Sequence, residues 1–167
     1  MSGAYRSIGI NRNDFMSLIQ MRPEGGTAYG TLEWVAYASN AFNTMVPFYA
    51  DVDETPEYLA NTTGEVSTEN FYWTSRMIAA MADASYGKSL FHVEHYQENV
   101  LAKSHALINQ YDALLADEKD PEKQMELKRK ANRKVAEMVQ KEASATLKKV
   151  LYELSNQMKN SYARSDV

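Results

Sequence analysis

One arginine within an otherwise apolar helical segment is the residue with the clearest chemical potential. The segment Val66–Asp83 repeats apolar residues at helical spacing, and Arg76 lies near its middle. Tyr72 lies one turn before Arg76 and Trp73 follows Tyr72, so the arginine stem should lie against aromatic rings. Two interpretations are open. The guanidinium either pairs with a carboxylate or reaches solvent, or it forms part of an active-site wall.

Two asparagines, Asn40 and Asn43, are the other polar side chains with a possible catalytic role. Both follow an apolar run, where an asparagine usually closes a turn through bonds to nearby backbone. The alternative is an amide that donates to a substrate carbonyl oxygen. Spacing alone does not choose between these two roles.

Other sequence motifs for metal binding, phosphate binding or nucleophilic catalysis are incomplete or absent. His92 and His95 share a helical face, but neither HExxH nor HxxEH occurs, so a surface pair is expected. Gly25-Gly26 joins two predicted strands and precedes no predicted helix, so it forms no phosphate-binding loop. Ser75 is expected to pack inside its helix. The sequence contains no cysteine, which excludes a disulfide, a thiolate metal site and a cysteine nucleophile within this chain. We expect no cofactor and no metal.

Composition sets limits on the class of protein. With 167 residues, 44% of them hydrophobic, the chain can bury a core as one domain or as part of a larger one. A net charge of −4 argues against a nucleic-acid partner, because there is no positive excess to neutralise phosphates. No apolar run approaches the roughly 20 residues that span a bilayer, and no signal sequence is recognisable. We therefore expect a cytoplasmic protein with no membrane partner.

Two short apolar runs, Phe15–Met21 and Thr31–Ala38, predict β-strands. Both carry apolar residues on both faces, which is typical of inner strands in a sandwich covered by helices. The turn residues of Pro23–Gly26 between them predict a hairpin. The preceding segment, Tyr5–Asn13, is expected to be either a third strand or a loop.

The chain after these strands turns and becomes helical. Pro47 should interrupt strand pairing, leaving an extended apolar segment around Tyr49. A polar loop is expected over Asp51–Gly64. The helix that carries Arg76 should then begin with Ser67 or Thr68 as its N-cap.

The last part of the chain predicts two long helices. Leu90 marks the start of helical structure, and the stripe within Phe91–Leu115 indicates one buried face. Asp120 and Pro121 form a strong start signal for the last helix, which should run to about Tyr162. At 1.5 Å per residue that helix would be roughly 60 Å long and would extend beyond its partner, unless it kinks. The Lys and Arg residues between Lys123 and Lys149 are expected to form a solvated face.

The sequence therefore predicts an α+β protein in three segments. Residues 1–52 would form the β-strand segment, residues 53–89 the loop and the Arg76 helix, and residues 90–167 a helical hairpin. An alternative from another functional class is a non-catalytic helical domain whose last helix binds a partner protein.

Three long segments resemble a known family. They are SIGINRNDFMSLIQMRP at Ser7–Pro23, EWVAYASNAFNTMVPFYADV at Glu33–Val52, and TPEYLANTTGEVSTENFYWTSRMIAAMAD at Thr55–Asp83. Together they resemble the carboxy-terminal part of the bacterial C69 (formerly U34) dipeptidases. The helical remainder fits the family's tail less distinctively.

The resemblance implies an N-terminal nucleophile hydrolase with an αββα sandwich, related in fold to penicillin V acylase and bile-salt hydrolase. In that family an amino-terminal cysteine attacks the peptide carbonyl, and its own α-amino group acts as base. Because this sequence has no cysteine, it would be the C-terminal portion of such an enzyme and inactive alone. Its partners would be a dipeptide substrate and the missing N-terminal portion of the same protein, and a homo-oligomer is compatible with the long last helix.

The resemblance also assigns expected roles to individual residues. The run Ser75–Ile78 matches a serine-arginine-apolar-apolar segment that borders the nucleophile in the relatives. Arg76 would orient the cysteine or a substrate carboxylate through two parallel hydrogen bonds, which lysine could not reproduce. Family members use asparagine amides to stabilise the tetrahedral oxyanion, so Asn40 and Asn43 are candidates for that role. Arg12 is a further candidate for the site.

Overall fold

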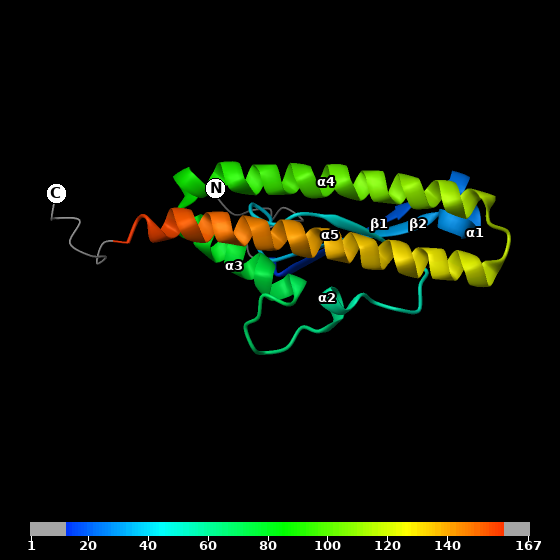
Figure 1. The fold of residues 1–167 in the computed structure, drawn as a ribbon, viewed down its shortest axis with the longest axis horizontal. Helices are drawn as coiled ribbons and strands as arrows, with labels where there is room; N and C mark the ends of the chain where they lie inside the picture. Colours follow the sequence, from blue (N-terminus) through cyan, green and yellow to red (C-terminus); the bar gives the residue numbers. More distant parts are fainter. Residues whose placement is uncertain (1–12, 159–167) are drawn as a thin grey trace, which may run out of the picture.

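The computed structural model describes residues 13–158, which form a small antiparallel sheet packed against long helices (Figure 1). This arrangement confirms the α+β class. The strands are β1 (Phe15–Met21), β2 (Thr31–Tyr37) and β3 (Val46–Tyr49), and the long helices are α3 (Phe71–Ala84), α4 (Tyr86–Asp117) and α5 (Pro121–Ser155). The short helices are the 3-10 helix η1 (Pro23–Gly25), α1 (Gly26–Tyr29) and α2 (Glu57–Ala60). The predicted strand or loop at Tyr5–Asn13 and the candidate Arg12 lie outside the described residues, apart from Asn13 itself.

The described sheet has the order β1-β2-β3, with both pairs antiparallel. The predicted hairpin is confirmed, because β1 pairs with β2 along its whole length. Its connection is longer than a tight turn, and the expectation that Gly25-Gly26 precedes no helix is wrong, since α1 begins at Gly26. The Arg22 backbone N–H donates to the Gly30 carbonyl at 2.6 Å and closes the hairpin. Gly30 must lack a side chain, because a Cβ there would lie 2.1 Å from the Gly26 carbonyl oxygen.

The expectation that Pro47 interrupts strand pairing is wrong. Pro47 lies inside β3, directly opposite Trp34 of β2. The Ala50 N–H donates to the Thr31 carbonyl, so the opposed pair of Trp34 and Pro47 falls at a position without ladder hydrogen bonds. The missing N–H of Pro47 therefore costs no bond to β2, as is usual for proline in an edge strand.

The two faces of the strands are not equally covered. Every residue of β3 is buried, and β2 is buried or half-buried along its length. The expectation of two inner strands is met by β2 within the described part of the chain, whereas most side chains of β1 are exposed there. A pattern of apolar residues on both faces identifies a strand that can be buried, but it does not state which element buries it.

The helices α4 and α5 form an antiparallel hairpin and lie side by side in Figure 1. The predicted start of α5 is confirmed, since the Asp120 side chain accepts a hydrogen bond from the Glu122 backbone N–H at 2.9 Å. Helix α4 begins at Tyr86 rather than Leu90, and α5 ends at Ser155 rather than near Tyr162. With 32 and 35 residues the two helices match in length, so the predicted overhang of the last helix is wrong.

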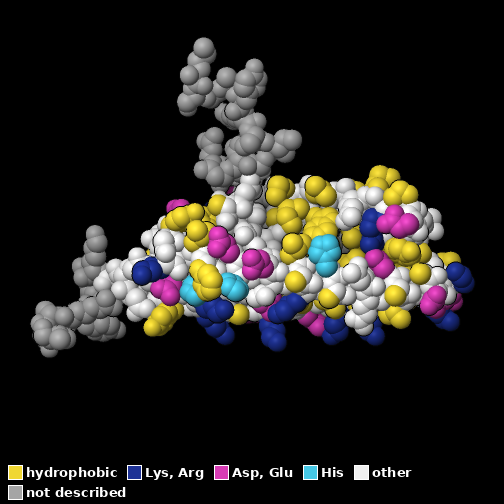
Figure 2. Space-filling model, turned by 90° about the horizontal axis from the view of Figure 1, so that it is seen from above, with side chains coloured by type: hydrophobic (Ala, Val, Ile, Leu, Met, Phe, Trp, Pro, Cys, Tyr) yellow, Lys and Arg dark blue, Asp and Glu magenta, His cyan; other side chains and the backbone are white. Residues whose placement is uncertain are grey.

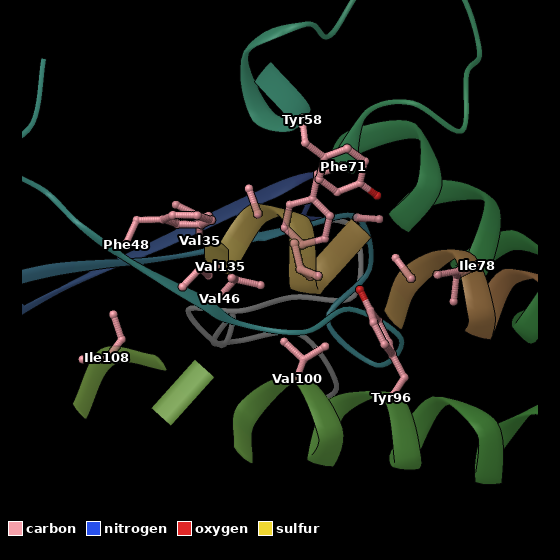
Figure 3. Packing of buried hydrophobic residues seen from close by; sticks show 14 of the residues in the cluster. Val35, Val46, Phe48, Tyr58, Phe71, Ile78, Tyr96, Val100, Ile108 and Val135 are labelled. Carbon is pink, nitrogen blue, oxygen red and sulfur yellow. The ribbon is translucent and has the colours of Figure 1, made fainter. Parts of the chain in front are cut away.

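The core lies where the sheet meets the helices (Figure 3). Val35 and Val46 from the sheet pack near Val135 of α5, and all three are buried. Helix α4 contributes a second set of buried side chains from its own stripe, which includes Tyr96, Val100 and Ile108. At the other end of the core, Tyr58 of α2 stacks on Phe71 of α3 with ring centroids 5.7 Å apart. Helix α2 lies in the segment that was expected to be only a polar loop.

Helix α3 begins later than predicted. Its N-cap is Asn70, whose side-chain oxygen accepts from the Trp73 backbone N–H at 2.9 Å, so Ser67 and Thr68 are not the caps. The predicted apolar stripe is confirmed by the burial of Phe71 and Ile78.

The basic residues of α5 are not simply a solvated face. Lys128 is buried, and its ammonium group donates to Asp51 Oδ2 at 2.5 Å and to the Thr27 carbonyl. Arg129 forms two hydrogen bonds to Asp53, which hold the pKa of that exposed carboxyl below its usual value. Three basic side chains of α5, namely Lys128, Arg129 and Arg133, thus pair with the acidic segment 51–54. Within residues 13–158, no helix combines the length and apolar character needed to cross a membrane.

Candidate functional site

An open hollow of about 660 Å³ lies where α3 meets the beginning of β1 and the loop after β2. Helix α3 supplies one wall, with Arg76 and Asp83 as its charged residues. The loop after β2 contributes small side chains and Phe42 to the lining, and the start of α4 contributes Tyr86. The full lining consists of Asn13, Asp14, Ala38, Ser39, Ala41, Phe42, Arg76, Ala79, Ala80, Asp83 and Tyr86.

Arg76 is held in place on three sides. Its Nη1 atom forms an ion pair with Asp14, the residue that precedes β1, and lies 3.3 Å from the Tyr72 hydroxyl. Its guanidinium carbon lies 5.6 Å from the Tyr72 ring centroid and 5.9 Å from that of Trp73, as the spacing predicts. The side chain remains 42% exposed, so the guanidinium can still reach a ligand in the hollow.

Aromatic contacts fix the helix that carries Arg76 against the sheet. The ring of Tyr37 at the end of β2 meets Phe71 edge-on at 5.2 Å and Tyr72 at 6.0 Å. Burial is the main cause that raises the pKa of the Tyr37 hydroxyl, and the Glu33 carboxylate raises it further, so Tyr37 stays neutral near pH 7. The position of Arg76 relative to β2 is therefore set by packing, not by the exposed ion pair alone.

The loop wall begins with an unusual backbone conformation. Ala38 has φ 66°, in the left-handed region, where a residue with a Cβ costs about 1 kcal/mol relative to the right-handed region. Its N–H donates to the Asp14 carbonyl at 2.9 Å, and the next turn is closed by bonds from Phe42 and Asn43 N–H to the Ser39 carbonyl. The conformation of Ala38 turns the chain sharply out of β2 and places Ser39 in the hollow.

The two candidate asparagines lie in this loop but not among the residues that line the hollow. Asn43 is buried, and its amide donates to the Ala38 carbonyl at 3.0 Å, which is the turn-closing role described above. Its own carbonyl accepts from the Gln97 side chain of α4 at 2.7 Å. Asn40 is half-buried in the same turn. The structure thus brings Arg76 and the loop that contains Asn40 and Asn43 to the same region.

The other candidate residues, His92, His95 and Ser75, contact neighbouring side chains or are buried, and none of them lines the hollow. His92 lies 3.4 Å from Glu153 of α5, and His95 packs against the Phe91 ring at 4.4 Å between centroids. Ser75 is buried, in agreement with a packing role. Within residues 13–158, no group of three or more His, Asp or Glu side chains is arranged to hold a metal ion.

Sequence reasoning missed the acidic partners of the site. Asp14 and Asp83 both line the hollow, one from the start of β1 and one from the last turn of α3. Asp83 shares a helical face with Arg76, because seven residues are two turns, and this spacing could have identified it. Asp14 is separated from Arg76 by 62 positions, so no local pattern indicates their contact.

Comparison with known proteins gives a consistent result. The model of a family described as peptidase family C69 matches residues 2–99. The chain is 41% identical over 164 residues to probable dipeptidase A of Streptococcus pyogenes serotype M18 (strain MGAS8232), covering 97% of this chain and 33% of that protein. It is 35% identical over 200 residues to a dipeptidase of Bifidobacterium longum (strain NCC 2705), covering 97% and 37%. Dipeptidase A of Lactobacillus helveticus is 30% identical over 108 residues, covering 65% and 23%.

Nearly all of this chain matches the two curated relatives from Streptococcus pyogenes and Bifidobacterium longum, but it spans only about one third of their length. More than half of the chain lies within the matched family region. On this evidence the chain belongs to peptidase family C69.

Proposed function

We propose that this chain is part of a dipeptidase, in which the hollow beside Arg76 forms one wall of the active site. The activity is supported by the family and by the names of the relatives, which are dipeptidases. The proposed location of the active-site wall is supported mainly by one observation. Arg76 is a half-exposed cation in the wall of the described hollow, held there by a carboxylate and two aromatic rings.

The nucleophile in this proposal is an amino-terminal cysteine that lies outside this chain, as the family resemblance implies. Its thiolate attacks the carbonyl carbon of the dipeptide, while its α-amino group takes up the thiol proton. The tetrahedral intermediate then collapses, the C–N bond breaks, and the proton passes to the leaving amine. Water hydrolyses the resulting thioester and releases the second amino acid. The sequence of this chain has no cysteine, so on its own it would be inactive.

Arg76 would act through charge and geometry. A guanidinium can donate two parallel hydrogen bonds to a carboxylate, and the free carboxylate of a dipeptide is a ligand of that kind. Asp14 already occupies one side of the Arg76 guanidinium and limits its rotation, so the group is oriented before substrate arrives. Asn40 and Asn43 are the proposed amide donors to the oxyanion, a role in which one lost donor costs about 3 kcal/mol.

The fold proposed for the complete enzyme is the αββα sandwich. In this chain the described sheet is covered by helices mainly at β2 and β3, and β1 remains exposed. A sheet left uncovered at one side is consistent with part of a larger layered domain. It is less consistent with the alternative, a self-contained helical interaction domain, in which apolar strand residues would be covered by the chain itself.

The test is substitution of Arg76 in the complete, longer protein, with a panel of dipeptides as substrates. We expect Arg76→Lys and Arg76→Ala each to lower kcat/KM by about 100-fold, or about 2.7 kcal/mol, with little change in Tm. Arg133→Ala is the matched control, because Arg133 is 41% exposed and also ion-paired, but it lies on α5 away from the hollow. It should leave kcat/KM unchanged.

Two outcomes would contradict the proposal. A wild-type protein that hydrolyses no dipeptide of the panel would exclude the activity. If activity in the Arg76 variants fell only in proportion to the fraction folded, with a clearly lowered Tm, Arg76 would be a structural residue and not part of the active-site wall.

A further inference from the structure

Strand β1 forms the outer edge of the described sheet, and most of its side chains are exposed, on both faces. Four of its large hydrophobic side chains are exposed, with Phe15 at 52%, Leu18 at 55%, Ile19 at 56% and Met21 at 79%. Figure 2 shows that hydrophobic side chains gather along one long side of the molecule and Lys and Arg side chains along the opposite side. A long, flat, apolar edge strand is a site for pairing with another strand.

The hydrogen bonds at the two ends of β1 establish which backbone groups point outward. The Ala38 N–H donates to the Asp14 carbonyl, and the Arg22 N–H donates to the Gly30 carbonyl. In an antiparallel ladder the bonded positions alternate, so the even-numbered residues of β1 direct their N–H and C=O groups toward β2. The N–H and C=O groups of the odd-numbered residues therefore point away from the sheet, and these residues are Phe15, Ser17, Ile19 and Met21.

The exposed side chains of β1 lie on both faces. Leu18 is opposite Trp34 and shares its face, whereas Ile19 is opposite Glu33 and points to the other face. A second copy of β1 could satisfy the outward backbone groups but would leave both of these faces open. An occupant that explains the whole strand must bring a strand for the edge and covering layers for both faces, which requires a large body of additional chain.

We propose that β1 pairs with a further β-strand from the remaining part of the longer polypeptide, and that this part also covers both faces of β1. The relatives supply the argument for this occupant, because this chain spans only 33% of the length of the Streptococcus pyogenes protein. The inference rests on the proposal that this chain is part of a longer dipeptidase, but not on any catalytic role of Arg76.

The test is hydrogen–deuterium exchange at single-residue resolution, on the 167-residue chain and on the longer protein that contains it. We expect the outward amides of Ser17, Ile19 and Met21 to exchange at least 100-fold more slowly in the longer protein. The inward amides of Met16 and Leu18 are the internal control, because they face β2 in both proteins and should be protected in both.

Three results would overturn this inference. Equally fast exchange of the outward amides in both proteins would show that no strand pairs with β1. If the outward amides are already protected in the 167-residue chain at every protein concentration, a segment of this chain pairs with β1. If their protection in that chain grows with protein concentration, a second copy of the chain pairs with β1. Since exchange is measured and not hydrolysis, failure of this inference is distinguishable from failure of the proposed catalytic role.

Discussion

The two edges of the same sheet differ in how they are completed. At β3 the outward N–H and C=O of Tyr49 both bond to the side-chain amide of Asn132 on α5, at 2.8 and 3.0 Å. The Tyr49 hydroxyl donates to Asp112 of α4 at 2.7 Å, so β3 is fixed to both helices of the hairpin. At β1 the outward groups of the strand have no such partner among residues 13–158 in the described sheet.

This difference shows which edge of the sheet has its backbone groups paired within the described part of the chain. A single amide side chain can replace a neighbouring strand because its C=O accepts and one N–H of its NH2 group donates at the spacing of a peptide group. Asn132 thereby gives both outward backbone groups of Tyr49 a partner at the β3 edge. Among residues 13–158 no side chain caps the β1 edge in this way, so the stability of the chain should depend strongly on the β3 edge and weakly on the β1 edge.

The largest expected effect comes from breaking the closed edge. Asn132→Ala should lower the free energy of unfolding by about 2–4 kcal/mol, because two buried backbone groups of Tyr49 lose their partner. Chemical denaturation of the chain measures this change. Asn99→Ala on the exposed face of α4 is the matched control and should stay within about 0.5 kcal/mol of wild type. Equal effects of the two substitutions would show that Asn132 does not close the edge.

An effect of intermediate size is expected from pH. Burial is the main cause that raises the pKa of the Tyr49 hydroxyl above 10.0, and its hydrogen bond to Asp112 adds to this. An unfolded tyrosine loses its proton near pH 10, whereas folded Tyr49 keeps it, so the unfolded state binds fewer protons above pH 10. The contribution of Tyr49 to the free energy of unfolding is therefore complete below pH 10. Above pH 10 it should fall by up to about 1.4 kcal/mol for each pH unit.

The variant Tyr49→Phe should remove this part of the alkaline slope, which denaturation at a series of pH values measures. Tyr152→Phe should keep it, because Tyr152 is 65% exposed. Parallel slopes for wild type and Tyr49→Phe would mean that Tyr49 titrates as an ordinary tyrosine.

The smallest effect is expected at the open edge. Ile19→Thr should change the free energy of unfolding of this chain by no more than about 0.5 kcal/mol, because the side chain is already half in water. Val46→Thr on β3 is the matched comparison, since it buries an unpaired hydroxyl at a fully buried position and should cost about 1–3 kcal/mol. A large loss of unfolding free energy for Ile19→Thr in the isolated chain would contradict the solvent exposure of β1.

Local patterns predicted much of the fold. Apolar runs located β1 and β2, and the turn residues between them indicated the hairpin. The pair Asp120-Pro121 located the start of α5 because capping and the missing proline N–H are local effects. The spacing around Arg76 predicted its aromatic neighbours, and three long segments together predicted the family, which the comparison confirms.

The errors arose where a distant contact decides the outcome. Pro47 was expected to break a ladder, but its ring lies at a position where no bond to β2 is needed. Lys128 was expected in solvent, but it is buried, and its ammonium group donates to Asp51 and to the Thr27 carbonyl. The expected oxyanion roles of Asn40 and Asn43 remain proposals, and for Asn43 the structure adds the hydrogen bond to the Ala38 carbonyl.

The sequence by itself determined β1, β2, the three long helices and the family, because periodicity, caps and motifs are properties of neighbouring residues. Only the tertiary structure decided that Asp14 meets Arg76 and that Asn132 closes the sheet at Tyr49, contacts that span 62 and 83 positions. It also decided that one apolar strand is buried and another is open. The physical reason is that apolar side chains create the same drive for burial in both strands, while the geometry of α4 and α5 lets them cover only one edge.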